Sequence, residues 1–154
     1  MRDFNEADKN KKNGRIQIPP NPANLTAEQL SKLESTVKSK LQDGNLPCGI
    51  AHKIAKEAGV TKIAVGEITD RLGIRIINCQ IGCFKVDKNV HSNTAPDDPG
   101  DRILGRLEEL GNNDELTCVK VFELAKELKL SPMAVADVAN YRNMKVRQCQ
   151  LGCF

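Results

Sequence analysis

The chain has 154 residues and a formal net charge of +3; 3% of its residues are aromatic, and none is Trp. So few aromatic side chains argue against base stacking on single-stranded nucleic acid, and so mild a charge permits nucleic-acid binding without indicating it. There is no apolar run long enough to cross a membrane, and the polar N-terminus lacks a signal-peptide core. We therefore expect a cytoplasmic protein, without a membrane partner, whose core is aliphatic and mainly helical.

The first expected elements are a tail and a helix. Residues 1–24 are polar and charged and are expected to form a disordered N-terminal tail. Thr26 and Gln29 then fit the capping box of a helix, and apolar residues follow at helical spacing. Asp43 and Gly44 are expected to end this helix.

Two more helices and a short strand are expected next. Pro47 suits the first turn of a helix, and Gly59 suits the left-handed residue at its end. Thr61 suits the cap of the following helix. The alternation in Ile74-Arg-Ile76 predicts a strand, and the apolar pattern then changes phase, which predicts a bulge or tight turn near Ile77–Asn78.

These elements occur twice. The hexapeptide Cys79-Gln-Ile-Gly-Cys-Phe84 returns, with one residue changed, as Cys149-Gln-Leu-Gly-Cys-Phe154, which is 70 positions later. Upstream, Ala55-Lys-Glu57 matches Ala125-Lys-Glu127 at the same offset. Such an internal match over most of the chain indicates a tandem duplication.

The duplication predicts the domain organisation. Residues 25–84 and 95–154 are the two copies, and residues 85–94 are the linker. Copies of this size lie near the lower limit for an independent hydrophobic core. We therefore expect them to pack together as an intramolecular pseudo-dimer.

The stretch Ile54-Ala-Lys-Glu-Ala-Gly-Val-Thr-Lys-Ile-Ala-Val-Gly-Glu-Ile68 resembles a helix-turn-helix. Ala55 is the small residue where two helices cross, and Gly59 accepts a positive φ in the turn. Each copy resembles a small winged helix-turn-helix domain, which implies a mainly α fold with short β, built as two tandem winged-helix-like three-helix repeats. Lys129 replaces the turn glycine in the second copy. Residues 121–131 also resemble the small N-terminal module of bacterial translation initiation factor two.

The winged-helix resemblance implies double-stranded DNA as the partner and transcription regulation as the function. Two repeats could address two half-sites from one chain. Glu67 and Asp70 fall on the same expected surface and would repel phosphates, so a solvated face or a protein-interaction module stays open as an alternative. No phosphate-cradling loop or Ser/His/Asp set indicates an enzyme. The candidate DNA contacts are Lys53, Thr61, Lys62, Arg71 and Arg75 in the first copy and Ser131, Arg142, Lys145 and Arg147 in the second.

The six cysteines occupy three equivalent positions in each copy, and three interpretations of them stay open. They are buried small apolar residues, or ligands of zinc or an iron–sulfur cluster, or thiols of a redox switch. The last residues of each copy decide between them, because two thiols four residues apart would lie roughly 13 Å apart in a strand but would meet in a helix or tight turn. A cysteine-based protein that binds or senses a metal or an iron–sulfur cluster is therefore the alternative function. The candidate ligands are Cys48, Cys79, Cys83, Cys118, Cys149 and Cys153.

Overall fold

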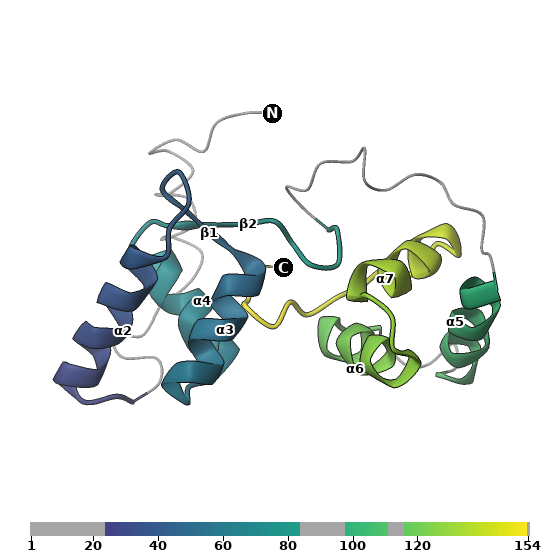
Figure 1. Cartoon of the computed structure of the whole chain (residues 1–154), viewed down its shortest axis with the longest axis horizontal. Coiled ribbons are helices and arrows are strands. Elements are labelled where there is room, and N and C mark those ends of the chain that lie inside the picture. Colours follow the sequence, from purple (N-terminus) through teal and green to yellow (C-terminus); the bar gives the residue numbers. More distant parts are fainter. Residues whose placement is uncertain (1–23, 84–97, 111–115, 154) are drawn as a thin grey trace. The chain divides into compact units, whose positions relative to one another are not determined.

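The structure is a computed structural model that describes residues 24–83, 98–110 and 116–153 (Figure 1). These residues form six helices and one two-stranded sheet. The expectation of a mainly helical fold with short β structure is confirmed. The expected tail, apart from Asn24, and the expected linker lie outside the described residues. Among the described helices, none combines the length and the apolar character needed to cross a lipid bilayer.

The chain divides into two compact units, Met1–Ile76 and Ile77–Phe154. In the first unit, α2 (Ala27–Ser39) begins with the expected capping box: the Gln29 N–H donates to the Thr26 hydroxyl over 3.2 Å, and the Thr26 N–H donates to the Gln29 side chain over 2.9 Å. The helix ends before Asp43 and Gly44. Those two residues instead form a tight turn, with φ of 48° and 75°, that pairs Gln42 with Asn45. Two consecutive positive φ values are typical of a type I′ turn, so the expected helix end was placed too late.

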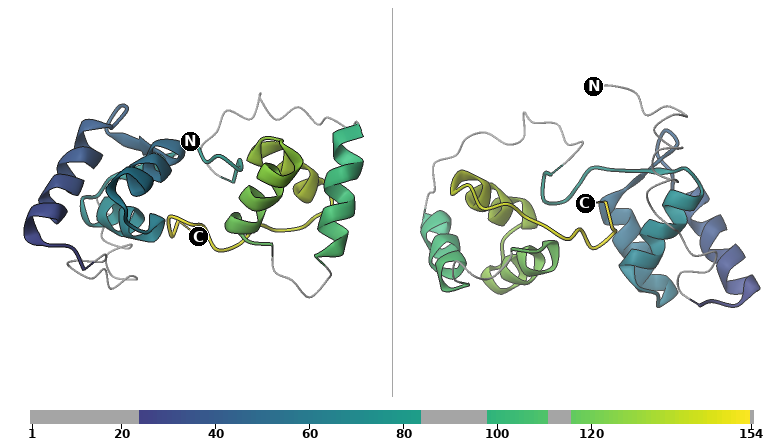
Figure 2. Two further views of the ribbon diagram at one scale, coloured as in Figure 1. Left: turned by 60° about the horizontal axis from the view of Figure 1, so that its bottom comes forward. Right: turned by 180° about the vertical axis from the view of Figure 1, so that it is seen from behind.

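The helix pair of the first unit is joined by the left-handed turn that the sequence predicts. α3 (Cys48–Ala58) ends at Gly59, with φ 67° and ψ 27°. The Val60 N–H donates to the Ala55 carbonyl over 3.0 Å, which closes a Schellman motif. The Thr61 hydroxyl then accepts from the Ala64 N–H and begins α4 (Lys62–Arg71). α3 and α4 lie side by side in all three ribbon views (Figure 2).

A short sheet accompanies this helix pair. β1 (Asn45–Pro47) precedes α3, and β2 (Arg75–Ile77) follows α4 and pairs with β1. The strand predicted from Ile74 is thus confirmed to within one residue. The buried core of the first unit is aliphatic, as the composition indicates; its largest members include Val37, Leu46, Ile54, Val65 and Ile68.

The second unit contains α5 (Asp98–Glu109), α6 (Cys118–Leu128) and α7 (Pro132–Tyr141). α6 and α7 begin and end 70 positions after α3 and α4. The single bridge between Thr117 and Arg147 stands where β1 pairs with β2 in the first unit. Positive φ values recur at the same offset, at Asn78 and Gln148 (both 52°). These two residues form the phase change that the sequence predicts near Ile77–Asn78 and in the second copy.

The hexapeptide of the first copy contributes to the core of the second unit. Cys79 and Ile81, with 3% and 4% of their surfaces exposed, belong to the same buried cluster as Ile103, Cys118 and Val121. The sequence repeat ends at Phe84, whereas the spatial unit begins at Ile77. Repeat and spatial unit therefore differ at this hexapeptide, because the side chains of Cys79 and Ile81 are buried among residues of the second copy.

Candidate functional site

The N-terminal end of α4 presents polar and apolar side chains together. Thr61 is exposed, Lys62 is half-buried, and Ile63 is 44% exposed although it is a large apolar residue. Glu67 and Asp70, one and two turns further along, are half-buried. This end of the helix offers a hydroxyl, an ammonium group and an apolar surface, and the carboxylates lie beyond them.

The other candidate cations of the first copy lie in different surroundings. Arg71, in the last turn of α4, forms an ion pair with Glu34 of α2. The Lys53 ammonium group lies 3.8 Å from a Glu57 carboxylate oxygen one turn along α3, with 73% of the lysine side chain exposed. Arg75 is half-buried on β2. The arginine within the second helix of the motif thus holds α4 against α2.

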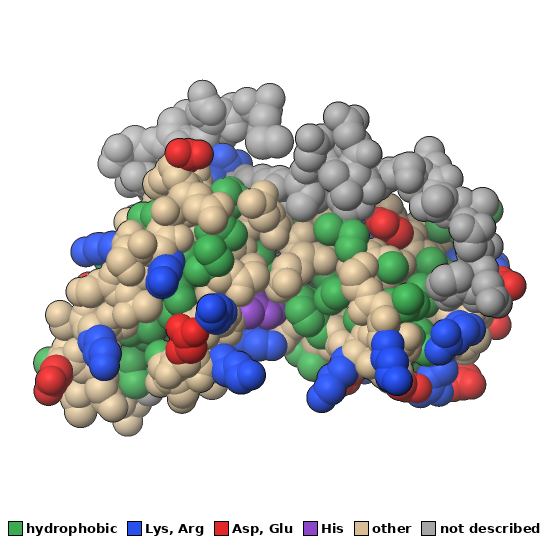
Figure 3. Space-filling view, in the orientation of Figure 1, with side chains coloured by type: hydrophobic (Ala, Val, Ile, Leu, Met, Phe, Trp, Pro, Cys, Tyr) green, Lys and Arg blue, Asp and Glu red, His purple; other side chains and the backbone are tan. Residues whose placement is uncertain are grey.

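The second copy places its candidate residues similarly. The Ser131 hydroxyl accepts from the Ala134 N–H over 3.2 Å and caps α7. Arg142 lies 4.0 Å from a Glu108 carboxylate oxygen, and Lys145 and Arg147 are exposed beyond the helix. Figure 3 shows Lys and Arg side chains along the lower edge of the visible surface, with Asp and Glu side chains among them.

Tyr141 is a surface feature that the sequence reasoning missed. It is the one tyrosine of the chain, it ends α7, and it is 69% exposed. An aromatic side chain among the polar residues Asn140 and Arg142 was the signal that could have found it. A large exposed aromatic ring is a common feature of contact surfaces.

The six cysteines occupy three kinds of surroundings, and none forms a disulfide. Cys48 and Cys118 begin α3 and α6 and are 5% and 4% exposed. Cys79 is equally buried, whereas Cys149 is half-buried. Cys83 and Cys153 are exposed. The interpretation as small buried residues therefore describes three of the six: Cys48, Cys79 and Cys118.

Residues 79–83 and 149–153, the described parts of the two hexapeptides, fold as tight turns rather than as strands. The Gly82 N–H donates to the Cys79 carbonyl over 3.0 Å, and the Gly152 N–H donates to the Cys149 carbonyl over 2.9 Å. Both glycines have positive φ, 72° and 70°. The turn brings the two thiols of each hexapeptide into hydrogen-bonding contact, Cys79 with Cys83 and Cys149 with Cys153. Of the two geometries left open by the sequence, the structure has the one in which the thiols meet.

The two turns differ in what surrounds their thiols. The hydrogen bond with Cys153 and the backbone N–H of Leu151, 3.4 Å from the sulfur, lower the pKa of Cys149 to about 6. In the first turn, the hydrogen bond with Cys79 and then burial raise the pKa of Cys83. Burial also raises the pKa of Cys118, opposed by the Gln150 side-chain amide, which donates to that sulfur over 3.4 Å.

The thiols of the second unit are close enough to influence one another. Cys79, Cys83, Cys118 and Cys149 interact electrostatically in every pairwise combination. Even so, within residues 24–83, 98–110 and 116–153 no group of three His, Cys, Asp or Glu side chains is arranged to hold a metal ion. Zinc or iron–sulfur binding by these cysteines stays a prediction.

A separate thiol–imidazole pair lies in the first unit. The Cys48 sulfur is 3.9 Å from His52 Nε2, one turn along α3. Burial and the charge of Lys62 lower the pKa of His52 to about 4, so the imidazole is neutral at pH 7. A neutral imidazole does not stabilise a neighbouring thiolate by charge, and this pair lacks the electrostatic activation of a reactive cysteine.

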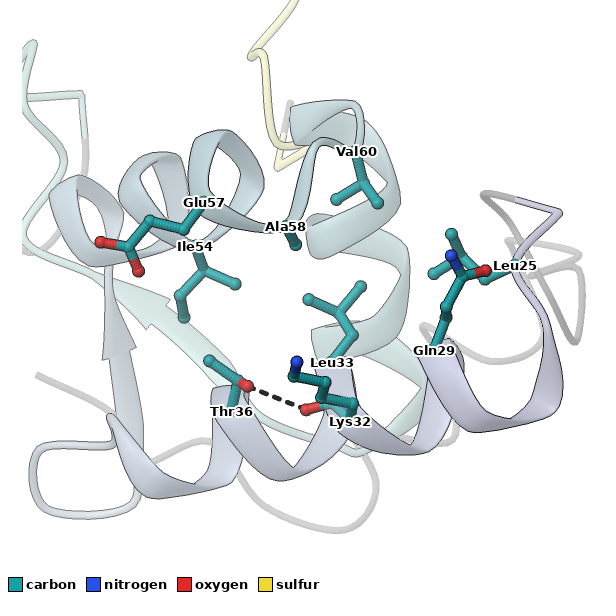
Figure 4. A pocket seen from close by; sticks show the side chains of 9 residues that line it. All are labelled: Leu25, Gln29, Lys32, Leu33, Thr36, Ile54, Glu57, Ala58 and Val60. Atoms are coloured by element: carbon teal, nitrogen blue, oxygen red, sulfur yellow. Dashed lines mark hydrogen bonds between the residues drawn. The ribbon is translucent and has the colours of Figure 1, made fainter.

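An open groove of 390 Å³ lies between α2 and the end of α3 (Figure 4). Leu33 and Ile54 line it with apolar surface, and Lys32, Thr36 and Glu57 add polar groups. The Thr36 hydroxyl donates back to the Lys32 carbonyl over 2.8 Å, so its hydrogen-bonding capacity is partly used within α2. Sequence patterns gave no signal for this groove, because it depends on the angle between two helices.

Comparison with protein-family models, curated proteins and solved structures gave no match.

Proposed function

We propose that this chain is a DNA-binding protein of the transcription-regulator kind that uses two helix-turn-helix units, α3–α4 and α6–α7, to contact duplex DNA. The observation that supports this most is the repeated turn. Gly59 and Lys129 have φ of 67° and 57°, and in each copy the second helix begins three residues later behind a hydroxyl cap. A duplication that preserved this turn even with a lysine in it points to a required angle between the helices.

The N-terminal end of the second helix is the part that would enter the major groove. In the first copy this end offers Thr61 and Lys62 for phosphate oxygens and the exposed Ile63 for an apolar contact with a thymine methyl group. In the second copy, Ser131 occupies the same position, and the exposed Tyr141 lies at the far end of α7.

The remaining candidate cations would hold the DNA backbone on either side of this helix. Lys53 and Arg75 serve the first copy, and Lys145 and Arg147 serve the second. Arg71 contributes less, because it is paired with Glu34. With carboxylates interspersed, we expect weak sequence-independent binding, with Kd values on the order of 10⁻⁴–10⁻⁶ M near physiological salt, and tighter binding only to a matching sequence.

Fluorescence anisotropy of a labelled duplex, titrated with the full chain at several salt concentrations, tests the proposal. We expect binding that weakens steeply as salt rises, because counterions are released from the DNA. Lys62→Ala should weaken binding and lower the slope of log K against log salt by about 1, as expected for one lost phosphate contact. Lys38→Ala is the matched control, since Lys38 is an exposed lysine on α2, outside the motif, and it should leave the slope unchanged. Equal effects of the two variants, or no binding at low salt, would contradict the proposal.

A further inference from the structure

The C-terminal hexapeptide has the geometry that a local disulfide needs. A disulfide requires Cα atoms about 4.4–6.8 Å apart, which residues four apart reach only where the chain folds back. The hydrogen bond from the Gly152 N–H to the Cys149 carbonyl folds it back here. The thiols of Cys149 and Cys153 are already in hydrogen-bonding contact. A disulfide between these two thiols would therefore require only a local adjustment of one turn and would leave the helices in place.

Accessibility distinguishes this pair from the other thiols. Cys153 is exposed and Cys149 is half-buried, so a small oxidant in solution can reach them. In the first hexapeptide Cys79 is 3% exposed inside the core of the second unit, although Cys83 is exposed. Cys118 is 4% exposed. A reactive thiol must be accessible as well as ionised, so the C-terminal pair is favoured over its counterpart.

The surroundings of Cys149 also favour a thiolate. The Leu151 N–H lies 3.4 Å from its sulfur, and Cys153 adds a second hydrogen bond. Both contacts stabilise negative charge on the sulfur. The lowered pKa of this group agrees with that geometry and follows from it.

The arrangement of the thiols favours redox chemistry over metal binding. A structural zinc site needs four converging ligands, and an iron–sulfur cluster needs several thiolates around one centre. Among the described side chains, four of the cysteines meet in two hydrogen-bonded pairs, and no set of three is arranged as metal ligands. A pair of thiols is sufficient for a disulfide.

We propose that Cys149 and Cys153 form a dithiol redox site that a hydroperoxide oxidises to an intramolecular disulfide. The Cys149 thiolate attacks one peroxide oxygen; an S–O bond forms, the O–O bond breaks, and the departing oxygen leaves as water or alcohol after taking up a proton. The Cys153 sulfur then attacks the Cys149 sulfur; the S–S bond forms, the S–O bond breaks and water leaves. The two thiols together lose two electrons and two protons, and the peroxide is reduced. A dithiol reductant would reverse the step by thiol–disulfide exchange, which returns both cysteines to thiols.

The oxidation state of each hexapeptide can be measured separately, because trypsin places the two hexapeptides in different peptides. Cleavage after Arg147 releases residues 148–154, and cleavage after Arg75 and Lys85 releases residues 76–85. The reduced full chain is treated with a small excess of hydrogen peroxide at pH 7 and then denatured, and its remaining thiols are blocked with a maleimide. After digestion, the masses of the peptides are measured by mass spectrometry. We expect peptide 148–154 to be lighter by two hydrogen atoms and unblocked, while peptide 76–85 carries two maleimides.

Variants separate this proposal from a structural effect. Cys153→Ser changes an exposed side chain, and in that variant Cys149 should stop at the sulfenic acid, which a dimedone probe captures. Cys48→Ala is the control, and it should leave oxidation of peptide 148–154 unchanged. Oxidation of both hexapeptides at equal rates, a disulfide between different chains, or no disulfide would overturn the proposal. So would stoichiometric zinc or iron in the purified protein that is lost in Cys153→Ser, since that result would assign a metal site.

Discussion

Gly59 and Lys129 are 70 residues apart in the chain and adopt the same left-handed conformation, with φ of 67° and 57°. Each residue ends the first helix of a pair, and the N–H of the residue that follows it bonds to the carbonyl of Ala55 or Ala125 over 3.0 or 2.8 Å. Glycine adopts this conformation at no steric cost, whereas lysine does so at the expense of a close Cβ approach. The second copy thus has the same turn although a lysine stands at the position of the glycine.

Substitutions at these two positions should change stability in opposite directions. Lys129→Gly should raise the free energy of unfolding by about 1 kcal/mol, because the strain of the left-handed residue is removed. Gly59→Ala should lower it by about 1 kcal/mol. A methyl group at Gly59 meets nothing within 4 Å, so the loss would come from the backbone and not from a clash. Urea unfolding followed by circular dichroism measures both variants.

Opposite signs at the two positions are the informative result. If Lys129→Gly destabilised the chain as well, the greater conformational entropy that glycine gives the unfolded chain would outweigh the relief of strain in the folded chain. The strain of the turn in the second copy would then be smaller than this entropic cost.

Ile81 should stabilise the second unit although it comes from the first copy of the sequence. Its side chain is 4% exposed in a cluster with Ile103 and Val121. Ile81→Ala should lower the free energy of unfolding by about 2–5 kcal/mol, as for other large buried residues. Ile76→Ala, at a residue 7% exposed on β2, is the comparison in the first unit.

Amide hydrogen exchange locates these two effects. Ile81→Ala should speed exchange in α6 and α7, and Ile76→Ala should speed exchange in α3 and α4. If Ile81→Ala weakened protection of the first unit alone, the assignment of the hexapeptide to the core of the second unit would be wrong.

His52 should make the chain less stable in mild acid. The unfolded chain takes up a proton at this residue near the ordinary pKa of 6.5, whereas burial and Lys62 hold the folded pKa at about 4. The unfolded state therefore binds more protons between these values, and stability falls as pH drops from 6.5 towards 4. His52→Phe introduces the residue that the second copy has at Phe122 and should flatten this part of the pH profile.

Stability of both proteins measured at several pH values from 4 to 8 checks this expectation. Carboxylates titrate in both proteins, so the difference between the two profiles isolates His52. Parallel profiles over the whole range would mean that His52 takes up its proton equally easily in the folded chain.

Much of the local structure could be predicted from the sequence, but little of the packing between elements could. The caps at Thr26 and Thr61 and the left-handed Gly59 could be predicted, because each depends on the residue type and its neighbours along the chain. The positions of Cys79 and Ile81 could not be predicted, because the sequence does not indicate in which unit's core an apolar side chain is buried. Asp43 and Gly44 suit a helix end and a tight turn equally well, and the pairing of Gln42 with Asn45 decides between them.

The candidate site was predicted in a similar, partial way. Repetition singled out the cysteines, and the phase change before each hexapeptide pointed to a bend, but exposure separates Cys149 from the buried Cys79 and depends on tertiary structure. The pairing of Arg71 with Glu34 also joins two helices and had no signal in the spacing of residues.

The most direct test of the DNA-binding account is an NMR titration of the isotopically labelled full chain with a short duplex at low salt. The account predicts that amide shifts change most around residues 61–66 and 131–136, at the N-terminal ends of α4 and α7, and that the changes fade as salt is added. Unchanged spectra with excess duplex, or changes confined to the groove between α2 and α3, would contradict it.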